Sequence, residues 1–322
     1  MFPKSLFITI VLALFISACG VPAVATNVPA TAPATALTEA SVTEMPKKIS
    51  AVDGLGRPVT LSAPAGKVVS LAPSNTEILY AVGAGNQVVG RDELSDFPAE
   101  AKAVDSVGGS MGDFNTEAIV ALKPDLVLAS ELNTPELVKS IEDLGITVYS
   151  VPNPKSFDDL YKNIEVVAAL TGHDATDLIH SLKARVAAVD EKIAPLSSRI
   201  PVFYELDGTD PLKPWTSGPG TFVDLLINRA GGSNVGSSLQ GEWTQISSEE
   251  LVKADPQVIL LGDALYGVTV ESVAARTGWD SITAVKNSAI YPFNPDTATR
   301  PGPRLVDALE EMAKLLRPDL FK

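Results

Sequence analysis

The chain has little of the chemistry that metal sites and disulfides require. It contains one cysteine and two histidines in 322 residues. A single cysteine cannot form a disulfide within the chain, so stability must come from the hydrophobic core. His173 and His180 are too few for a histidine-based zinc or manganese site, and we expect both on the solvated surface. The sequence therefore predicts no metal site.

Positive charge is also scarce, with 25 Lys and Arg against 39 Asp and Glu and a net charge of −14. This sign disfavours nucleic acid as a partner, because its phosphates attract basic surfaces. The chain has no P-loop, GxSxG or HExxH motif, and GAGNQVVG (83–90) lacks the spacing of a dinucleotide-binding loop. We expect no catalytic residue and no cofactor. An extracytoplasmic enzyme or a sensor lipoprotein remains the alternative from another class.

Residues 1–18 have the features of a secretory signal peptide. Lys4 precedes an apolar run from Leu6 to Ile16, and two small residues precede Cys19. The run is shorter than the roughly 20 apolar residues of a membrane-spanning helix. We expect lipidation of Cys19 after cleavage; the alternative is ordinary secretion with a free thiol. Residues 19–47 are rich in Ala, Thr, Pro and Val without periodicity, which predicts a disordered, lipid-anchored tether.

One phrase occurs twice in the rest of the chain. Residues 115–129 read NTEAIVALKPDLVLA, and residues 247–261 read SSEELVKADPQVILL. Each copy predicts a short helix, a break at a proline and an apolar strand, with Glu117 or Glu249 in the first helical turn. A first-turn carboxylate stabilises its own helix by about 0.3 to 1 kcal/mol, which would explain either glutamate alone. The matched pair instead predicts two similar lobes and a partner that binds both at once.

Strands and helices alternate in the first half of the chain, which predicts a parallel sheet covered on both faces. A strand over 67–72 is followed by Ser74 and Glu77 at capping-box spacing, at the start of a helix. Beyond the first half, residues 174–196 place apolar side chains on one helical face. This pattern predicts one rigid connecting helix of roughly 30 Å.

These patterns divide the folded part of the chain into three predicted segments. We expect an N-terminal α/β lobe over residues 48–172, a connecting helix over residues 173–197 and a C-terminal α/β lobe over residues 198–322. Because a single packed helix is stiffer than a Gly/Ser linker, we expect the lobes to keep a nearly constant separation.

Six segments in order resemble the substrate-binding lipoproteins of ABC importers for corrinoids and iron complexes, and cobalamin-binding members in particular. The segments are VVSLAPSNTEILYAVGAG, SDFP, NTEAIVALKPDLVLA, WTSGPGTFVDLLINRAGGSN, WTQISSEELVKADPQVILL and RPGPRLVDALEEMAKLL. The resemblance implies two similar Rossmann-like lobes joined by one long helix, with the ligand in the cleft between them. It also implies a monomer outside the cytoplasm, held at the membrane by lipid on Cys19. Its partners would be a permease dimer with ATPase subunits and a small-molecule ligand.

The resemblance also assigns candidate residues by position. Trp243 and Trp215 lie on aromatic ligand-contact positions, and Asp296 with Arg300 lies on a polar pair that contacts the side amides of a corrin. Glu117 and Glu249 match glutamates that bind arginines of the permease. In open α/β sheets, ligands bind beyond the carboxyl ends of the strands. On that basis we add the loop residues Pro73, Ser74 and Asn75.

Three further ligand-contact positions differ from the cobalamin-binding relative. They hold Leu94, Met111 and Ser130, where that relative has aromatic side chains. The ligand therefore stays open among cobalamin, another corrinoid, haem and a ferric siderophore.

Overall fold

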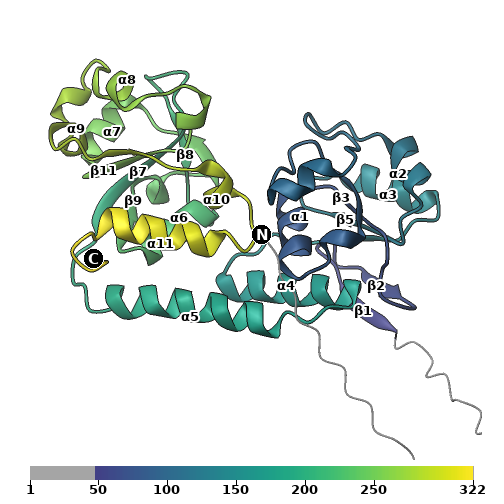
Figure 1. Cartoon of the computed structure of the whole chain (residues 1–322). Helices are drawn as coiled ribbons and strands as arrows, with labels where there is room; N and C mark the ends of the chain where they lie inside the picture. Colours follow the sequence, from purple (N-terminus) through teal and green to yellow (C-terminus); the bar gives the residue numbers. More distant parts are fainter. Residues whose placement is uncertain (1–47, 322) are drawn as a thin grey trace, which may run out of the picture. The chain divides into compact units, whose positions relative to one another are not determined.

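The computed structural model describes residues 48–321, which belong to one compact unit (Figure 1). The predicted signal peptide, the tether and Cys19 lie outside the described residues. Within residues 48–321, no helix combines the length and the apolar composition needed to cross a membrane.

The first half of the chain forms a four-stranded parallel sheet in the order β4-β3-β5-β6. Every residue of β3, β5 and β6 is buried, as expected for a parallel sheet covered on both faces. A hairpin of β1 and β2 precedes this sheet. The strands are β1 (Ile49–Val52), β2 (Pro58–Leu61), β3 (Val68–Ser70), β4 (Val88–Arg91), β5 (Leu126–Ala129) and β6 (Val148–Ser150), and the helices are α1 (Pro73–Ala81), α2 (Thr116–Leu122), α3 (Pro135–Asp143) and α4 (Phe157–Thr171).

The second half forms a separate six-stranded sheet in the order β10-β8-β7-β11-β12, with β9 also paired to β7. This sheet is mixed: β8 and β10 are antiparallel to their neighbours, and the other strand pairs are parallel. The strands are β7 (Ile200–Asp207), β8 (Trp215–Ser217), β9 (Gly232–Asn234), β10 (Trp243–Gln245), β11 (Val258–Leu261) and β12 (Ile290–Pro292), and the helices are α6 (Phe222–Arg229), α7 (Ser248–Ala254), α8 (Val270–Ala274), α9 (Thr283–Lys286), α10 (Pro295–Thr299) and α11 (Leu305–Leu316).

The repeated phrase forms the same structure in both halves. Side chains of Asn115 and Ser247 cap α2 and α7 by accepting a hydrogen bond from a backbone N–H. Both helices end at a left-handed residue, Lys123 (φ 50°) and Asp255 (φ 45°), and a proline follows each. The strand that comes next, β5 or β11, lies inside its sheet between two parallel neighbours. Both lobes therefore carry one copy of the same helix–strand unit.

The predicted connecting helix is α5 (Thr176–Ile193). On its apolar face, Leu178 is partly buried, and Leu182, Val186, Val189 and Ile193 are buried. They belong to one hydrophobic cluster that also contains Val68 of the first sheet and Val202 of the second. A continuous apolar core therefore runs from one lobe through α5 to the other. The lobe boundaries at 172 and 198 stay a prediction.

The predicted capping box at the start of α1 is wrong. The helix begins at Pro73, and its N-cap, Ala72, has no side chain that can accept a hydrogen bond. Glu77 is only 3% exposed, and its carboxylate binds the guanidinium of Arg304 instead. A long-range charged partner has replaced the local contact that the spacing predicted.

Candidate functional site

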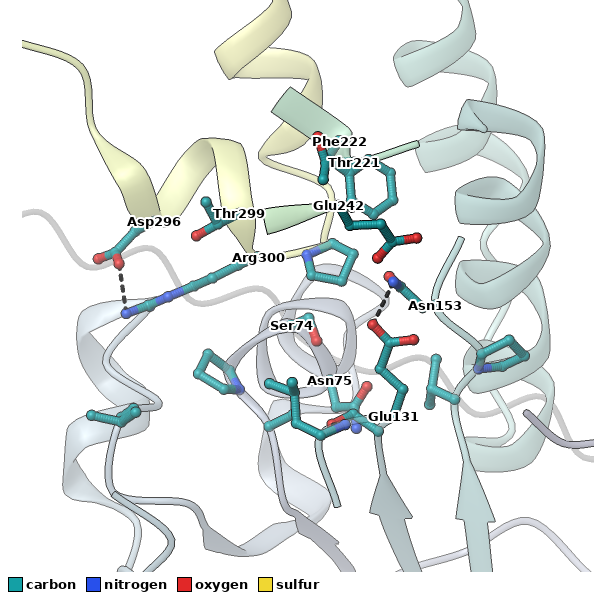
Figure 2. A pocket seen from close by; sticks show the side chains of 18 of the residues that line it. Ser74, Asn75, Glu131, Asn153, Thr221, Phe222, Glu242, Asp296, Thr299 and Arg300 are labelled. Carbon is teal, nitrogen blue, oxygen red and sulfur yellow. Dashed lines mark hydrogen bonds and ion pairs between the residues drawn. The ribbon is translucent and has the colours of Figure 1, made fainter. Parts of the chain in front are cut away.

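A cavity of about 370 Å³ lies at the carboxyl ends of strands from both sheets (Figure 2). Its N-terminal-lobe walls are the loops that follow β3, β4, β5 and β6, and its other walls come from the C-terminal lobe. The volume lies within the range of about 300 to 1,000 Å³ that is typical of small-molecule sites. The position agrees with the rule that open α/β sheets bind ligands beyond their strand ends.

Most of the predicted ligand-binding residues line this cavity. The structure brings together eight of them: Pro73, Ser74, Asn75, Leu94, Ser130, Trp243, Asp296 and Arg300. Trp215 and Met111 are not among the lining residues. Met111 lies in an exposed loop before α2 and is 90% exposed.

Trp215 and Trp243 differ in their distance from the cavity although they are neighbours in the sheet. They lie on the paired strands β8 and β10, where Trp215 is opposite Gln245 and Trp243 is opposite Ser217. Directly opposed residues share a face, and Gln245 lies two residues after Trp243 on β10. Both indoles therefore lie on the same face of the sheet. Their exposures are nearly equal, 41% and 42%, yet only Trp243 reaches the cavity.

Sequence reasoning did not single out two acidic residues that line the cavity, Glu131 and Glu242. Glu131 directly follows Ser130 at the end of β5, and its Oε1 accepts a hydrogen bond of 2.5 Å from the Asn153 amide. Glu242 pairs with Lys155 of the other lobe, with Nζ to Oε1 at 3.0 Å. The position of Glu131 at a strand end was a usable signal. Nothing local in the sequence indicated the partner of Glu242.

The environment of Glu131 shifts its titration. Burial raises the pKa of Glu131 above its usual value, Lys155 acts in the opposite direction, and the nearby carboxylate of Glu242 raises it further. In Figure 2, Glu131 and Glu242 extend toward one another, with Asn153 between them. The two lobes thus present like charges across one end of the cavity.

Arg300 connects the cavity with both lobes. Its guanidinium donates to Asp96 of the N-terminal lobe at 2.7 Å and pairs with Asp296 of α10 at 2.9 Å. Burial alone would raise the pKa of Asp96, but the hydrogen bond and charge of Arg300 outweigh it and hold that pKa below its usual value. The predicted polar pair Asp296–Arg300 is therefore formed, and it is part of a contact between the lobes.

Asn75 provides a buried acceptor at the floor of the cavity, where Figure 2 shows its side chain. Its amide nitrogen donates to the carbonyl oxygens of Leu128 and Ala129 at 3.2 and 2.9 Å. These two bonds fix the orientation of the amide. Its Oδ1 is buried and has no hydrogen-bond partner within the part of the chain that the structure describes.

The two matched glutamates lie away from these residues. Glu117 and Glu249 are exposed in the first turns of α2 and α7. The hydrogen bonds and ion pairs among residues 48–321 include neither carboxylate, whereas the adjacent Glu250 caps α7 through Ser247. Each copy of the helix–strand unit thus presents one exposed first-turn glutamate whose carboxylate has no partner among residues 48–321.

Two α/β lobes, one connecting helix packed against both and a cavity lined by both lobes are the features of a solute-binding protein. A family model described as "Periplasmic binding protein" matches residues 68–297, and the chain belongs to this family. It is 37% identical to the "Uncharacterized ABC transporter substrate-binding lipoprotein YvrC" of Bacillus subtilis, covering 84% of this chain and 86% of the relative.

Solved structures give the same result. The periplasmic vitamin B12 binding protein BtuF of Vibrio cholerae is 28% identical with a TM-score of 0.68, over 79% of this chain and 98% of that one. The periplasmic heme-binding protein RhuT of Roseiflexus sp. RS-1 is 26% identical with a TM-score of 0.70, over 80% and 100%. The chain is thus a substrate-binding protein of an ABC transporter, in a family of transport proteins and not of enzymes.

Proposed function

We propose that this protein captures a corrinoid outside the cytoplasm and delivers it to the permease dimer of an ABC importer. The observation that carries the proposal is the cavity between the lobes, where Trp243 provides an aromatic wall and Asp296 and Arg300 a polar pair. An aromatic wall with a few placed polar groups suits a large, flat ligand. The B12-binding structure among its relatives supports the corrinoid in particular.

Haem is the second candidate ligand, and one residue favours it. The phenol of Tyr266 lines the cavity and is 80% exposed, and tyrosine is one of the side chains that ligate haem iron. The heme-binding relative supports the same reading. A ferric siderophore is a third member of the same ligand group.

We further propose that Glu117 and Glu249 bind arginines of the permease, one from each lobe. The support is their equivalent place in the two copies of the helix–strand unit and their exposure, with no hydrogen bond or ion pair to either carboxylate within residues 48–321. We also propose that the protein is a monomer and that lipid on Cys19 attaches it to the membrane. The lipoprotein name of the Bacillus relative supports that anchor.

Titration calorimetry and absorbance spectroscopy test the ligand class on the fragment that lacks residues 1–47, whose described residues 48–321 belong to one compact unit. Cobalamin, haem and a ferric hydroxamate are compared under one buffer condition. The corrinoid proposal predicts saturable binding of cobalamin at one site. Binding of haem alone, with a spectrum lost in Tyr266→Phe, would replace the corrinoid with haem. No binding of any of the three would refute the proposal.

A further inference from the structure

We propose that Glu131 and Glu242 determine the specificity of this site: they accept hydrogen bonds from donor groups on the ligand and exclude ligands that carry peripheral carboxylates. The inference rests on the proposed function and deepens it. It predicts that the periphery of the ligand is uncharged and rich in hydrogen-bond donors, such as carboxamide groups. It also predicts that Glu131 and Glu242 select such ligands over ligands with carboxylates.

The charges around the cavity are unbalanced. Its lining includes three carboxylates, Glu131, Glu242 and Asp296, and its lining residues with described positions include one cation, Arg300. Both terminal nitrogens of Arg300 already face a carboxylate, that of Asp96 at 2.7 Å and that of Asp296 at 2.9 Å. The positive charge of this guanidinium is therefore already compensated by two carboxylates, which weakens its attraction for an anionic ligand.

Lys155 does not correct the imbalance. Its Nζ lies 3.0 Å from Oε1 of Glu242 and is held there across the lobes. It does not belong to the lining of the cavity. The positive charge nearest the two glutamates is thus already paired with one of them.

Each glutamate has one oxygen still able to accept a hydrogen bond. Oε1 of Glu131 accepts a hydrogen bond from the Asn153 amide, and Oε1 of Glu242 accepts one from Nζ of Lys155. The hydrogen bonds described for residues 48–321 leave both Oε2 atoms without a donor. Figure 2 shows the two side chains extending toward each other from the two lobes, with Asn153 between them, so a ligand group at this end of the cavity would face both carboxylates.

Asn75, at the floor of the cavity, also provides a hydrogen-bond acceptor. Oδ1 of Asn75 is a buried acceptor without a donor in the described part of the chain, and its residue is 1% exposed and lines the cavity. Buried polar atoms are nearly always hydrogen-bonded in folded proteins. A ligand donor at the floor would satisfy this buried atom, and the exposed carboxylates of Glu131 and Glu242 are further acceptors on the cavity lining.

A carboxamide satisfies these acceptors and a carboxylate cannot. The NH₂ group of a carboxamide supplies two donors without charge, whereas an ionised carboxylate only accepts. A ligand carboxylate at this end of the cavity would also add a third negative charge beside Glu131 and Glu242. These two carboxylates already oppose each other, since Glu242 contributes to the raised pKa of Glu131. Like-charge contacts of this kind are an effective way to reject a wrong partner.

Two probes with one ring system test the inference on the purified mature protein. Dicyanocobinamide carries carboxamides around its corrin ring, and dicyanocobyrinic acid carries carboxylates at the same positions. We expect the wild type to bind the amide probe at least about a hundredfold more tightly, because several like-charge contacts are avoided. Raising the salt concentration should reduce this ratio of affinities, since screening weakens the repulsion between the glutamates and the carboxylates of the acid probe.

Isosteric variants then assign the effect to the two residues. Glu131→Gln with Glu242→Gln should raise the affinity for the acid probe at least about tenfold and change that for the amide probe by less than about threefold. Glu136→Gln is the control, because Glu136 is exposed and does not line the cavity. Adding Lys155→Gln separates the loss of the carboxylates from the release of Lys155. A thermal melt shows that each variant is folded.

The outcomes separate this inference from the proposed function. Equal affinity of the wild type for both probes, or unchanged acid-probe affinity in the double variant, would overturn the role of Glu131 and Glu242 and leave the corrinoid function standing. A gain that disappears when Lys155→Gln is added would also overturn it, because the lysine would then be its source. Failure of both probes to bind would refute the proposed corrinoid function itself.

Discussion

Arg304 and Glu77 form an ion pair between the lobes although 227 residues separate them. Arg304 Nε donates to Glu77 Oε2 at 2.9 Å, and Nη2 donates to Oε1 at 2.6 Å. The guanidinium also lies 4.0 Å from the centroid of the Phe97 ring. The Glu77 side chain is 2% exposed and that of Arg304 14%. This buried pair fastens α1 of one lobe to the residue that precedes α11 of the other.

Removing Arg304 should therefore destabilise the protein strongly. Arg304→Ala leaves a buried carboxylate without its partner, and we expect a loss of about 3 to 5 kcal/mol in the free energy of unfolding. Urea denaturation at neutral pH measures it. Because burial raises the pKa of Glu77, this carboxyl can become neutral in mildly acidic buffer, and the loss should shrink there.

The control is an ion pair at the surface. Lys139 and Asp143 are 73% and 63% exposed, and Lys139→Ala should leave stability almost unchanged, because surface pairs contribute little. If Arg304→Ala were no more damaging than Lys139→Ala, the buried pair would not hold the lobes together.

The attachment of α5 to the C-terminal lobe should depend on pH. Arg185 donates to Glu310 at 2.9 and 2.8 Å and to Asp307 at 2.6 Å. The hydrogen bond from Arg185 holds the pKa of Glu310 below its usual 4.5. A lowered pKa stabilises the fold above the unfolded-state value, and this contribution is lost as pH falls through the folded-state pKa.

Unfolding free energies of the wild type and Glu310→Gln should therefore converge on acidification. At neutral pH we expect the wild type to be more stable by up to about 1 kcal/mol, because the pair is partly exposed. The difference should begin to shrink as the pH falls to about 4.5 and continue to shrink below it. Chemical denaturation at several pH values measures it. A difference that grew on acidification would contradict the assigned pairing.

Trp243 should contribute more to ligand affinity than Trp215. Trp243→Ala removes an aromatic wall of the cavity, and buried tryptophan contacts in interfaces often contribute about 2 kcal/mol or more. We expect at least about tenfold weaker ligand binding. Trp215→Ala is the matched control, with the same residue type, the same sheet face and nearly equal exposure. Calorimetric titration compares the ligand affinities of the two variants. A larger effect of Trp215→Ala would show that the ligand contacts Trp215 more than Trp243.

Reversing both matched glutamates should abolish transport without changing ligand affinity. In Glu117→Lys with Glu249→Lys, each lobe presents a positive charge to the permease arginines, and like charges placed together oppose docking. Uptake of labelled ligand by cells measures transport, and titration of the purified variant measures affinity.

The control variant carries the same charge change elsewhere. Glu165 and Glu191 are exposed on α4 and α5, so reversing them should leave uptake intact. If the Glu117 and Glu249 reversals weakened ligand binding instead, these residues would belong to the ligand site.

The sequence alone predicted the features that depend on neighbouring residues. The helix–strand units after Asn115 and Ser247 were readable because caps, the proline break and apolar runs act within a few residues. The apolar face of α5 followed from helical periodicity, and its observed span, Thr176–Ile193, falls inside the predicted segment. Pro73, Ser74 and Asn75 were predicted because they follow a strand end, where parallel sheets bind ligands. The other five predicted residues that line the cavity followed from the family resemblance.

The tertiary structure alone decided the partners of the charged side chains. Glu77 had the spacing of a helix cap, yet the fold placed Arg304 beside it. Glu242 pairs with Lys155 of the other lobe. Trp243 lines the cavity, whereas Trp215 does not. Caps and periodic faces form within one segment, so local sequence specifies them. Ion pairs and cavity walls join segments that meet only after both lobes have packed, so their geometry is a property of the whole fold.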